Sequence, residues 1–206
     1  MGTNSPRFEL EAVGLLDVNC YLVSIPENER LYLIDPGADA DLIIRHARKF
    51  EFKNAAVLLT HAHVDHIGAI REVMDALKIS DVYLHPADAP LYKSPDNHLL
   101  PYVPAAQNLP ETKWPPPKTE LKALHTPGHS QGGVCYLFEQ FPALFSGDTL
   151  FNGSIGRTDF PGGDFAALMN SIATQLLNLP GDLPIYPGHG PHSTISQEKH
   201  NNPFLK

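Results

Sequence analysis

Hydrophobic positions along the first third of the chain follow two different periods. Strand-like runs occupy residues 8–14, 19–25 and 31–37, and the last of these closes with a Pro-Gly turn signal. Apolar positions recur at helical spacing over 39–50, and the short, almost wholly apolar run 55–60 is typical of a strand covered on both faces. Strands and helices therefore alternate from the start.

The same alternation continues in the rest of the chain. A second amphipathic helix is expected over 68–78. Asp39 or Asp41 is expected to cap the start of the helix over 39–50. Near the end of the chain, Thr194 and Gln197 stand in capping-box positions and predict a last short helix. The Pro-rich segment 86–118 predicts a covering loop with one short helical turn. The remaining expected elements are strands over 81–85, 120–126, 132–139, 143–151 and 184–190, and a helix over 164–179. Interleaved strands and helices predict an α/β protein whose sheets are covered by helices.

Composition narrows the class of protein. With 206 residues and 42% hydrophobic content, we expect residues 1–206 to form one domain with a sizeable core. A net charge of −8 argues against nucleic acid as a partner. No segment approaches the about 20 apolar residues of a membrane span, and the amino terminus lacks an export signal, so we expect a cytoplasmic protein. Cys20 and Cys135 sit in apolar runs and are expected to pack in the core.

The stretch LLTHAHVDHIGAI, residues 58–70, gathers metal-binding side chains at the end of a predicted strand. Alternate side chains of an extended chain point the same way, so His61 and His63 can reach one point while Asp65 and His66 reach a second beside it. A lone histidine here would be a polar side chain with ordinary hydrogen bonds, but three histidines and an aspartate within residues 61–66 favour a metal cluster. Imidazole and carboxylate suit zinc, and also iron or manganese.

Three further polar residues follow apolar strands and are flanked by glycine: His129, Asp148 and His189. Together with the first cluster they make five histidines and two aspartates, which fill two metal positions if one carboxylate bridges. Two divalent ions, two aspartates and a hydroxide leave a centre of charge about +1, which attracts an anionic transition state and lowers the pKa of bound water. The expected cofactor is two divalent ions, zinc first.

The segment THAHVDH resembles the T-H-x-H-x-D-H signature of the metallo-β-lactamase superfamily, over residues 8–200. The resemblance implies a four-layer αββα sandwich, two mixed sheets with helices on their outer faces. It also implies that one metal is held by His61, His63 and His129. The second would be held by Asp65, His66 and His189, with Asp148 bridging.

Within that superfamily, the segments GDTLFNGSIGRTDFPGG, TPGHSQGG and PGHGPHST look most like glyoxalase II, in its short bacterial form without the carboxy-terminal helical domain. True β-lactamases usually have Cys or His where Asp148 stands, and RNA-processing members are larger. The resemblance implies hydrolysis of glutathione thioesters, notably S-lactoylglutathione. Arg157 and Asp159 align with a Lys and a Tyr that contact glutathione in that group. Arg157 is therefore a candidate for substrate binding, or else forms an ion pair with Asp159 or Asp164.

The expected reaction is attack of a metal-bridging hydroxide on a thioester carbonyl, with Asp65 and Asp148 as catalytic residues. The substrate would be a small-molecule thioester, and the protein a monomer or small homo-oligomer. Alternatives are a persulfide dioxygenase with one iron on His61, His129 and Asp148, a hydrolase of another small ester or lactone, and a non-catalytic metal-binding scaffold. His85, His125 and His192 lack ligand spacing, and we expect them to orient ligands or lie at the surface.

Overall fold

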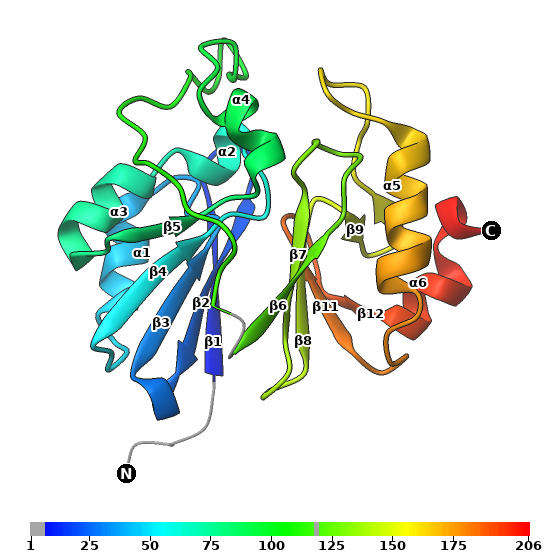
Figure 1. Ribbon diagram of the computed structural model, residues 1–206, viewed down its shortest axis with the longest axis horizontal. Coiled ribbons are helices and arrows are strands. Elements are labelled where there is room, and N and C mark those ends of the chain that lie inside the picture. Colours follow the sequence, from blue (N-terminus) through cyan, green and yellow to red (C-terminus); the bar gives the residue numbers. More distant parts are fainter. Residues whose placement is uncertain (1–6, 118–119) are drawn as a thin grey trace.

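Two five-stranded sheets lie face to face in the computed structural model, which describes residues 7–117 and 120–206 (Figure 1). In the first sheet the order is β1-β2-β3-β4-β5. Its members are β1 (Arg7–Val13), β2 (Val18–Ile25), β3 (Arg30–Ile34), β4 (Asn54–Leu58) and β5 (Asp81–Tyr83). The pairs β1/β2 and β2/β3 are antiparallel, whereas β3/β4 and β4/β5 are parallel, so this sheet is mixed.

The second sheet is also mixed, with the order β12-β11-β8-β7-β6. Its members are β6 (Leu121–His125), β7 (Val134–Phe138), β8 (Ala143–Gly147), β11 (Pro184–Pro187) and β12 (Ser193–Thr194). Only β8 and β11 pair in parallel within this sheet. A separate two-stranded hairpin is formed by β9 (Leu150–Phe151) and β10 (Ser154–Ile155).

Helices cover the outer faces of both sheets. Figure 1 shows α1 (Ala40–Ala47) and α3 (Ile70–Leu77) outside the first sheet, with α5 (Phe165–Ser171) and α6 (Ile195–Asn201) outside the second. The short helices α2 (Val64–Ile67) and α4 (Ala89–Tyr92) lie at the upper end of the sandwich in that view. A π-helical turn (Ile172–Leu176) continues α5, and single 3-10 turns occupy Pro26–Asn28, Pro86–Asp88 and Pro203–Leu205.

Three buried apolar layers follow from this arrangement. Alternate side chains of β2 point to opposite faces, so Tyr21 packs between the two sheets while Cys20 packs against the outer helices. Cys135 of β7 likewise lies in the outer layer beneath α5. Both thiols are free and fully buried, which confirms their predicted place in the core. Three apolar layers thus separate four layers of secondary structure, in the order helix, sheet, sheet and helix, as in the expected sandwich.

Several expected boundaries are different in the structure. The run 143–151 divides after Gly147, because that residue turns the chain at a φ of 49° and leaves Asp148 outside any strand. Asp39 stands at the N-cap of α1, but its Oδ2 accepts from the Gly14 amide at 2.8 Å instead of capping its own helix. Thr194 does cap α6, accepting from the Gln197 amide at 3.2 Å.

None of the helices in the described part of the chain has the length and apolar character needed to cross a membrane.

Candidate metal centre

The seven candidate ligands all lie at one edge of the sandwich, in loops and a short helix that follow strands. The loop after β4 and the helix α2 supply four of them, and the loops after β6, β8 and β11 supply one each. They are His61, His63, Asp65, His66, His129, Asp148 and His189. The strands bring together side chains as far apart as 128 positions in the sequence, from 61 to 189. The structure thus places the whole predicted set side by side.

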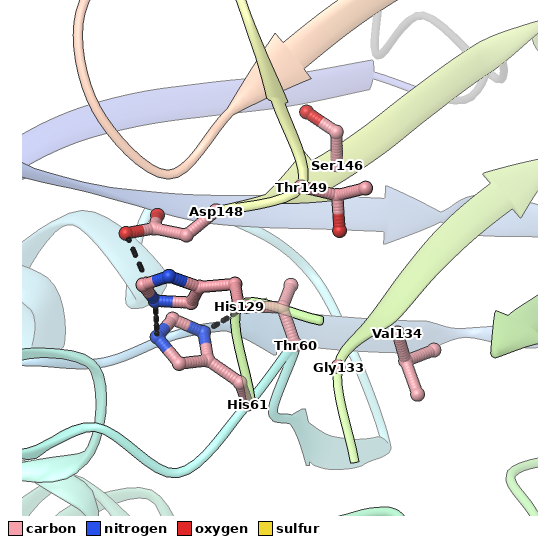
Figure 2. Close-up of a pocket in the computed structure, with 8 residues that line it drawn as sticks. All are labelled: Thr60, His61, His129, Gly133, Val134, Ser146, Asp148 and Thr149. Carbon is pink, nitrogen blue, oxygen red and sulfur yellow. Dashed lines mark hydrogen bonds and ion pairs between the residues drawn. The ribbon is translucent and has the colours of Figure 1, made fainter. Parts of the chain in front are cut away.

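His61, His63 and His129 form one group of facing imidazoles. His63 Nδ1 lies 2.9 Å from His129 Nε2, which in turn lies 3.3 Å from His61 Nε2. Nitrogens bound at about 2.0–2.1 Å to one tetrahedral zinc ion are about 3.3 Å apart. Figure 2 shows His61 and His129 pointing toward each other, with the Asp148 carboxylate beside His129. These three nitrogens can converge on one ion.

Asp65, His66 and His189 form the second group. Asp65 Oδ2 lies 3.7 Å from His66 Nε2 and 3.5 Å from His189 Nε2. His66 is fully buried, whereas His189 is partly exposed. The ligand atoms of this group, like those of the first, lie within 4.8 Å of one another.

The Asp148 carboxylate stands between the two groups. Its Oδ2 is 3.6 Å from both His129 Nε2 and His189 Nε2, and its Oδ1 is 3.5 Å from His66 Nε2. One carboxylate therefore faces a histidine of the first group and two of the second. This is the position that a bridging ligand requires.

Hydrogen bonds to the other ring nitrogen orient three of these histidines. Nδ1–H of His129 donates to the Arg157 carbonyl at 2.7 Å, and Nδ1–H of His189 donates to the Leu16 carbonyl at 2.9 Å. Nδ1–H of His66 donates to Asp35 Oδ2 at 3.0 Å. Because carbonyl and carboxylate oxygens only accept, these bonds place the proton on Nδ1 and leave Nε2 free for a metal.

Asp35 supports the site although the sequence did not single it out. This buried residue follows β3 with a φ of 52°, and its two oxygens accept from the Thr60 amide (2.7 Å) and the Thr60 hydroxyl (2.6 Å). The Thr60 hydroxyl also lies 3.1 Å from His61 Nδ1 (Figure 2). Asp35 therefore fixes His66 directly and His61 through Thr60. The only signal in the sequence was an aspartate ending an apolar strand, as the ligands do.

Asp88 joins two ligand-bearing loops from within the Pro-rich segment. Its carboxylate is buried and accepts from the Ala62 amide at 3.0 Å, between His61 and His63. It also accepts from the Ser130 hydroxyl at 2.8 Å and from the Gly132 amide, close to His129. This role could not be predicted from the sequence, because an aspartate among prolines is typical of a turn.

The electrostatics of the second group favour a bound cation. Burial acts against a charge on His66, but Asp148, Asp65 and Asp35 outweigh it and raise the pKa of His66 to about 10. In the first group, burial together with the neighbouring His129 and His66 rings lowers the pKa of His63 to about 4. Among the described residues, three buried side-chain atoms lack a hydrogen-bond partner: Arg30 Nε, His66 Nε2 and Asp148 Oδ1. The last two belong to the candidate centre, where they face each other at 3.5 Å. Buried polar atoms normally have partners, so these two fit a metal ion.

The Arg157 side chain lies beside the first group and is paired with Asp159. Two hydrogen bonds of 2.7 Å join the guanidinium to the Asp159 carboxylate, and the guanidinium carbon lies 3.9 Å from the centre of the Phe160 ring. That ring is 5.5 Å from the His63 ring. Asp164 instead accepts from the Ala167 amide at the start of α5. Of the two ion pairs considered for Arg157, the structure contains the one with Asp159.

The three histidines expected to support the site or lie at the surface make other contacts. His85 and His125 stack with ring centres 3.9 Å apart, and Trp114 meets His85 edge-on at 4.9 Å. His192 lies 6.0 Å from the Tyr186 ring, measured between centres. His125 and His192 are exposed and His85 is partly buried, and in the described part of the chain none of the three hydrogen-bonds a candidate ligand.

Comparison with protein families agrees with this geometry. The family model described as the metallo-beta-lactamase superfamily matches residues 13–189. The chain belongs to the metallo-beta-lactamase superfamily. The predicted family and fold are thereby confirmed.

Individual members of the superfamily are similar over nearly the full chain. Hydroxyacylglutathione hydrolase GloC of Haemophilus influenzae is 34% identical over 208 residues, covering 97% of this chain and 98% of GloC. The B3 metallo-beta-lactamase BLEG-1 superposes with a TM-score of 0.88 at 36% identity, covering 97% of this chain and all of that one. TTHA1623, solved in a di-iron-bound form, superposes with a TM-score of 0.83 at 38% identity, covering 96% and 100%. The chain is therefore an enzyme of this metallo-hydrolase superfamily, and it fits the short glyoxalase II-like group.

Proposed function

We propose that the protein hydrolyses glutathione thioesters in the manner of glyoxalase II, with S-lactoylglutathione or a related hydroxyacylglutathione as substrate. The observation that carries the proposal is the pair of three-ligand groups with one carboxylate, Asp148, between them. The similarity to GloC over 97% of the chain supports the choice of thioester.

In this proposal His61, His63 and His129 hold one divalent ion, and Asp65, His66 and His189 hold the other. Zinc is the first choice, with iron or manganese as alternatives, because imidazole and carboxylate bind all three. The di-iron form of TTHA1623 supports a site with two ions. Bound ions would supply a water that ionises near neutral pH and a Lewis acid for the carbonyl oxygen.

Two carboxylates act on the reacting groups in this proposal. Asp148 lies between the two ligand groups and contributes negative charge to both. The second oxygen of Asp65 can accept a hydrogen bond from the attacking water and so orient it. A thiolate leaves readily, so no residue has to donate a proton to the leaving group.

Arg157 is proposed to contact the thiol portion of the substrate. Its guanidinium is half exposed, next to Phe160 and on the His63 side of the centre. Asp159 binds one edge of the guanidinium, the edge formed by Nε and Nη2. The other edge, formed by Nη1 and Nη2, keeps donors for a substrate carboxylate, so Arg157 can contact glutathione without losing Asp159.

The test measures metal content and activity together in His63→Ala and Asp148→Ala variants, with His125→Ala as a histidine control outside the ligand set. We expect the wild type and the control to bind two ions per chain and to hydrolyse S-lactoylglutathione. Both ligand variants should lose metal and activity. Wild-type hydrolysis in either ligand variant would refute the proposal.

An oxygen electrode with glutathione persulfide separates the alternative reaction. One iron per chain together with oxygen uptake would show that the protein is a dioxygenase and not a hydrolase. Two ions, thioester hydrolysis and no oxygen uptake would support the hydrolase.

A further inference from the structure

A cleft of about 200 Å³ opens beside the second ligand group. One wall is the β1–β2 hairpin, residues 13–18, and the other includes two residues of the Pro-rich segment. Its lining includes Leu15, Leu16, Ala38, Asp65, Tyr102 and Val103. The candidate ligand Asp65 is thus also part of the cleft.

The lining side chains are apolar apart from the Asp65 carboxylate and the Tyr102 hydroxyl, and none of the described lining residues carries a positive charge. Leu15 and Tyr102 are 75% and 74% exposed, and Leu16 is 45% exposed. Grouped, exposed apolar side chains rimming a cavity are typical of a ligand-binding surface. A carboxylate of glutathione would find no cationic partner among these residues, whereas an apolar group would contact apolar side chains.

The cleft is fixed relative to the ligands by a backbone contact. The Leu16 carbonyl accepts from Nδ1–H of His189 at 2.9 Å, so the hairpin that forms one wall also orients a ligand. Arg157 and Phe160, in contrast, lie beside His63 of the first ligand group. The two sides of the centre therefore differ in chemistry: charged at the first group and apolar at the second.

We infer that this cleft binds the acyl side of the substrate, and that the preferred substrates are 2-hydroxyacyl thioesters whose substituent at C2 is an aryl or branched alkyl group. The inference rests on the proposed function, because it assumes a thioester at the metal centre. It adds that the thiol portion lies toward Arg157 while the acyl substituent lies among Leu15, Leu16 and Tyr102.

The size of the cleft sets the size of that substituent. An apolar protein cavity of about 150 Å³ is known to accommodate benzene. The present cleft is somewhat larger, so a phenyl group fits, whereas the methyl group of a lactoyl substrate leaves most of the cleft empty. A single additional methylene in such a pocket commonly changes specificity by about tenfold or more. The phenyl group should therefore be preferred by at least that factor.

The experiment compares S-mandeloylglutathione with S-lactoylglutathione on the metal-loaded enzyme. The wild type should have a kcat/KM about tenfold or more higher for the mandeloyl thioester. In a Leu15→Ala/Tyr102→Ala double variant the ratio of the two kcat/KM values should fall about tenfold. Both side chains are largely exposed, so their removal leaves the core intact. Phe165→Ala, which removes an exposed aromatic side chain on α5, should leave the ratio unchanged. A ratio near one in the wild type, or the same ratio in the double variant, would overturn the inference.

Calorimetric binding of the product acids tests the cleft without turnover. Mandelate should bind the metal-loaded protein more tightly than lactate, and the difference should vanish in the double variant. If neither thioester is hydrolysed, the proposed function is wrong. The binding of the two acids still tests whether the cleft prefers an aryl substituent. Equal affinity for both acids would refute it.

Discussion

Gly188 gives the sharpest test of how closely the backbone must approach the metal centre. A Cβ added at this position would lie 2.2 Å from Asp148 Oδ1 and 2.9 Å from His66 Cε1. Real Cβ contacts essentially never fall below 3.0 Å, so the Asp148 oxygen would have to move by at least 0.8 Å, the difference between 3.0 and 2.2 Å. The backbone of Gly188 lies outside the positive-φ region, so alanine adds a clash without left-handed strain.

The backbone cannot easily absorb that clash. The Gly188 amide donates to the Gly147 carbonyl at 2.8 Å, and the Gly188 carbonyl accepts from the Asn19 amide at 2.7 Å. The carboxylate must therefore move instead, away from His66, His129 and His189. A misplacement of about 1 Å can cost about 100-fold in rate. We expect Gly188→Ala to lose about 100-fold in kcat/KM, equivalent to about 2.7 kcal/mol of transition-state stabilisation.

Gly153→Ala is the matched control. Gly153 lies in the β9–β10 turn with a φ of +71°, and a Cβ there would meet nothing within 4 Å. Alanine should cost about 1–2 kcal/mol in backbone strain, seen in denaturant unfolding, while metal content stays at the wild-type level. Gly188→Ala should bind metal more weakly in a chelator competition. Wild-type metal affinity and rate in Gly188→Ala would refute the placement of Asp148 between the two ligand groups.

Three further outcomes follow from the supporting residues and from the buried histidines. Asp35→Asn should weaken metal binding by about 10–100-fold, because its amide cannot replace both oxygens that serve Thr60 and His66; unchanged affinity in a chelator titration would contradict this role. Asp88→Asn should lower the free energy of unfolding of the metal-free protein by about 1–3 kcal/mol, because at least one buried donor loses its acceptor; urea denaturation at wild-type stability would disprove that. The metal-free protein should be most stable near pH 6.5. Folding depresses the pKa of His63 to about 4, so its contribution to stability is present above the unfolded value of 6.5 and is lost as the pH falls to 4. Folding raises the pKa of His66 to about 10, so its contribution to stability is full below pH 6.5 and is lost as the pH rises to 10. For each histidine, the free energy of unfolding should change with a limiting slope of about 1.4 kcal/mol per pH unit. A free energy of unfolding that stays constant from pH 4 to 10 would contradict both pKa shifts.

The candidate ligands could be predicted from the sequence because each follows an apolar strand and stands in a dense or glycine-flanked setting. Strand ends at one edge of a sandwich converge, so residues as distant as His61 and His189 meet. Their assignment to metal remains a prediction that the geometry supports. Gly188 had a visible reason to be glycine only once the backbone was seen against Asp148.

Asp35 and Asp88 were not predicted, for a physical reason. Each acts by accepting hydrogen bonds from backbone amides and hydroxyl groups in segments far away in the sequence, such as the Asp88 contact with Ala62. Any residue except proline can supply a backbone amide, so the partners leave no mark in the residue pattern. A buried carboxylate of this kind becomes recognisable only when its surroundings are known.

The cleft was unpredictable for a different reason, and it bears on how such an enzyme changes substrate. Leu15, Leu16 and Tyr102 lie in a turn and in an irregular segment, where apolar residues have no period that reveals a shared surface. None of these three is a candidate metal ligand, and only the Leu16 backbone contacts one. Their side chains can therefore be exchanged while all seven ligands keep their strand-end positions. If the cleft binds the acyl substituent, the β1–β2 turn and the Pro-rich segment would determine the substrate, while the strand ends would determine the chemistry.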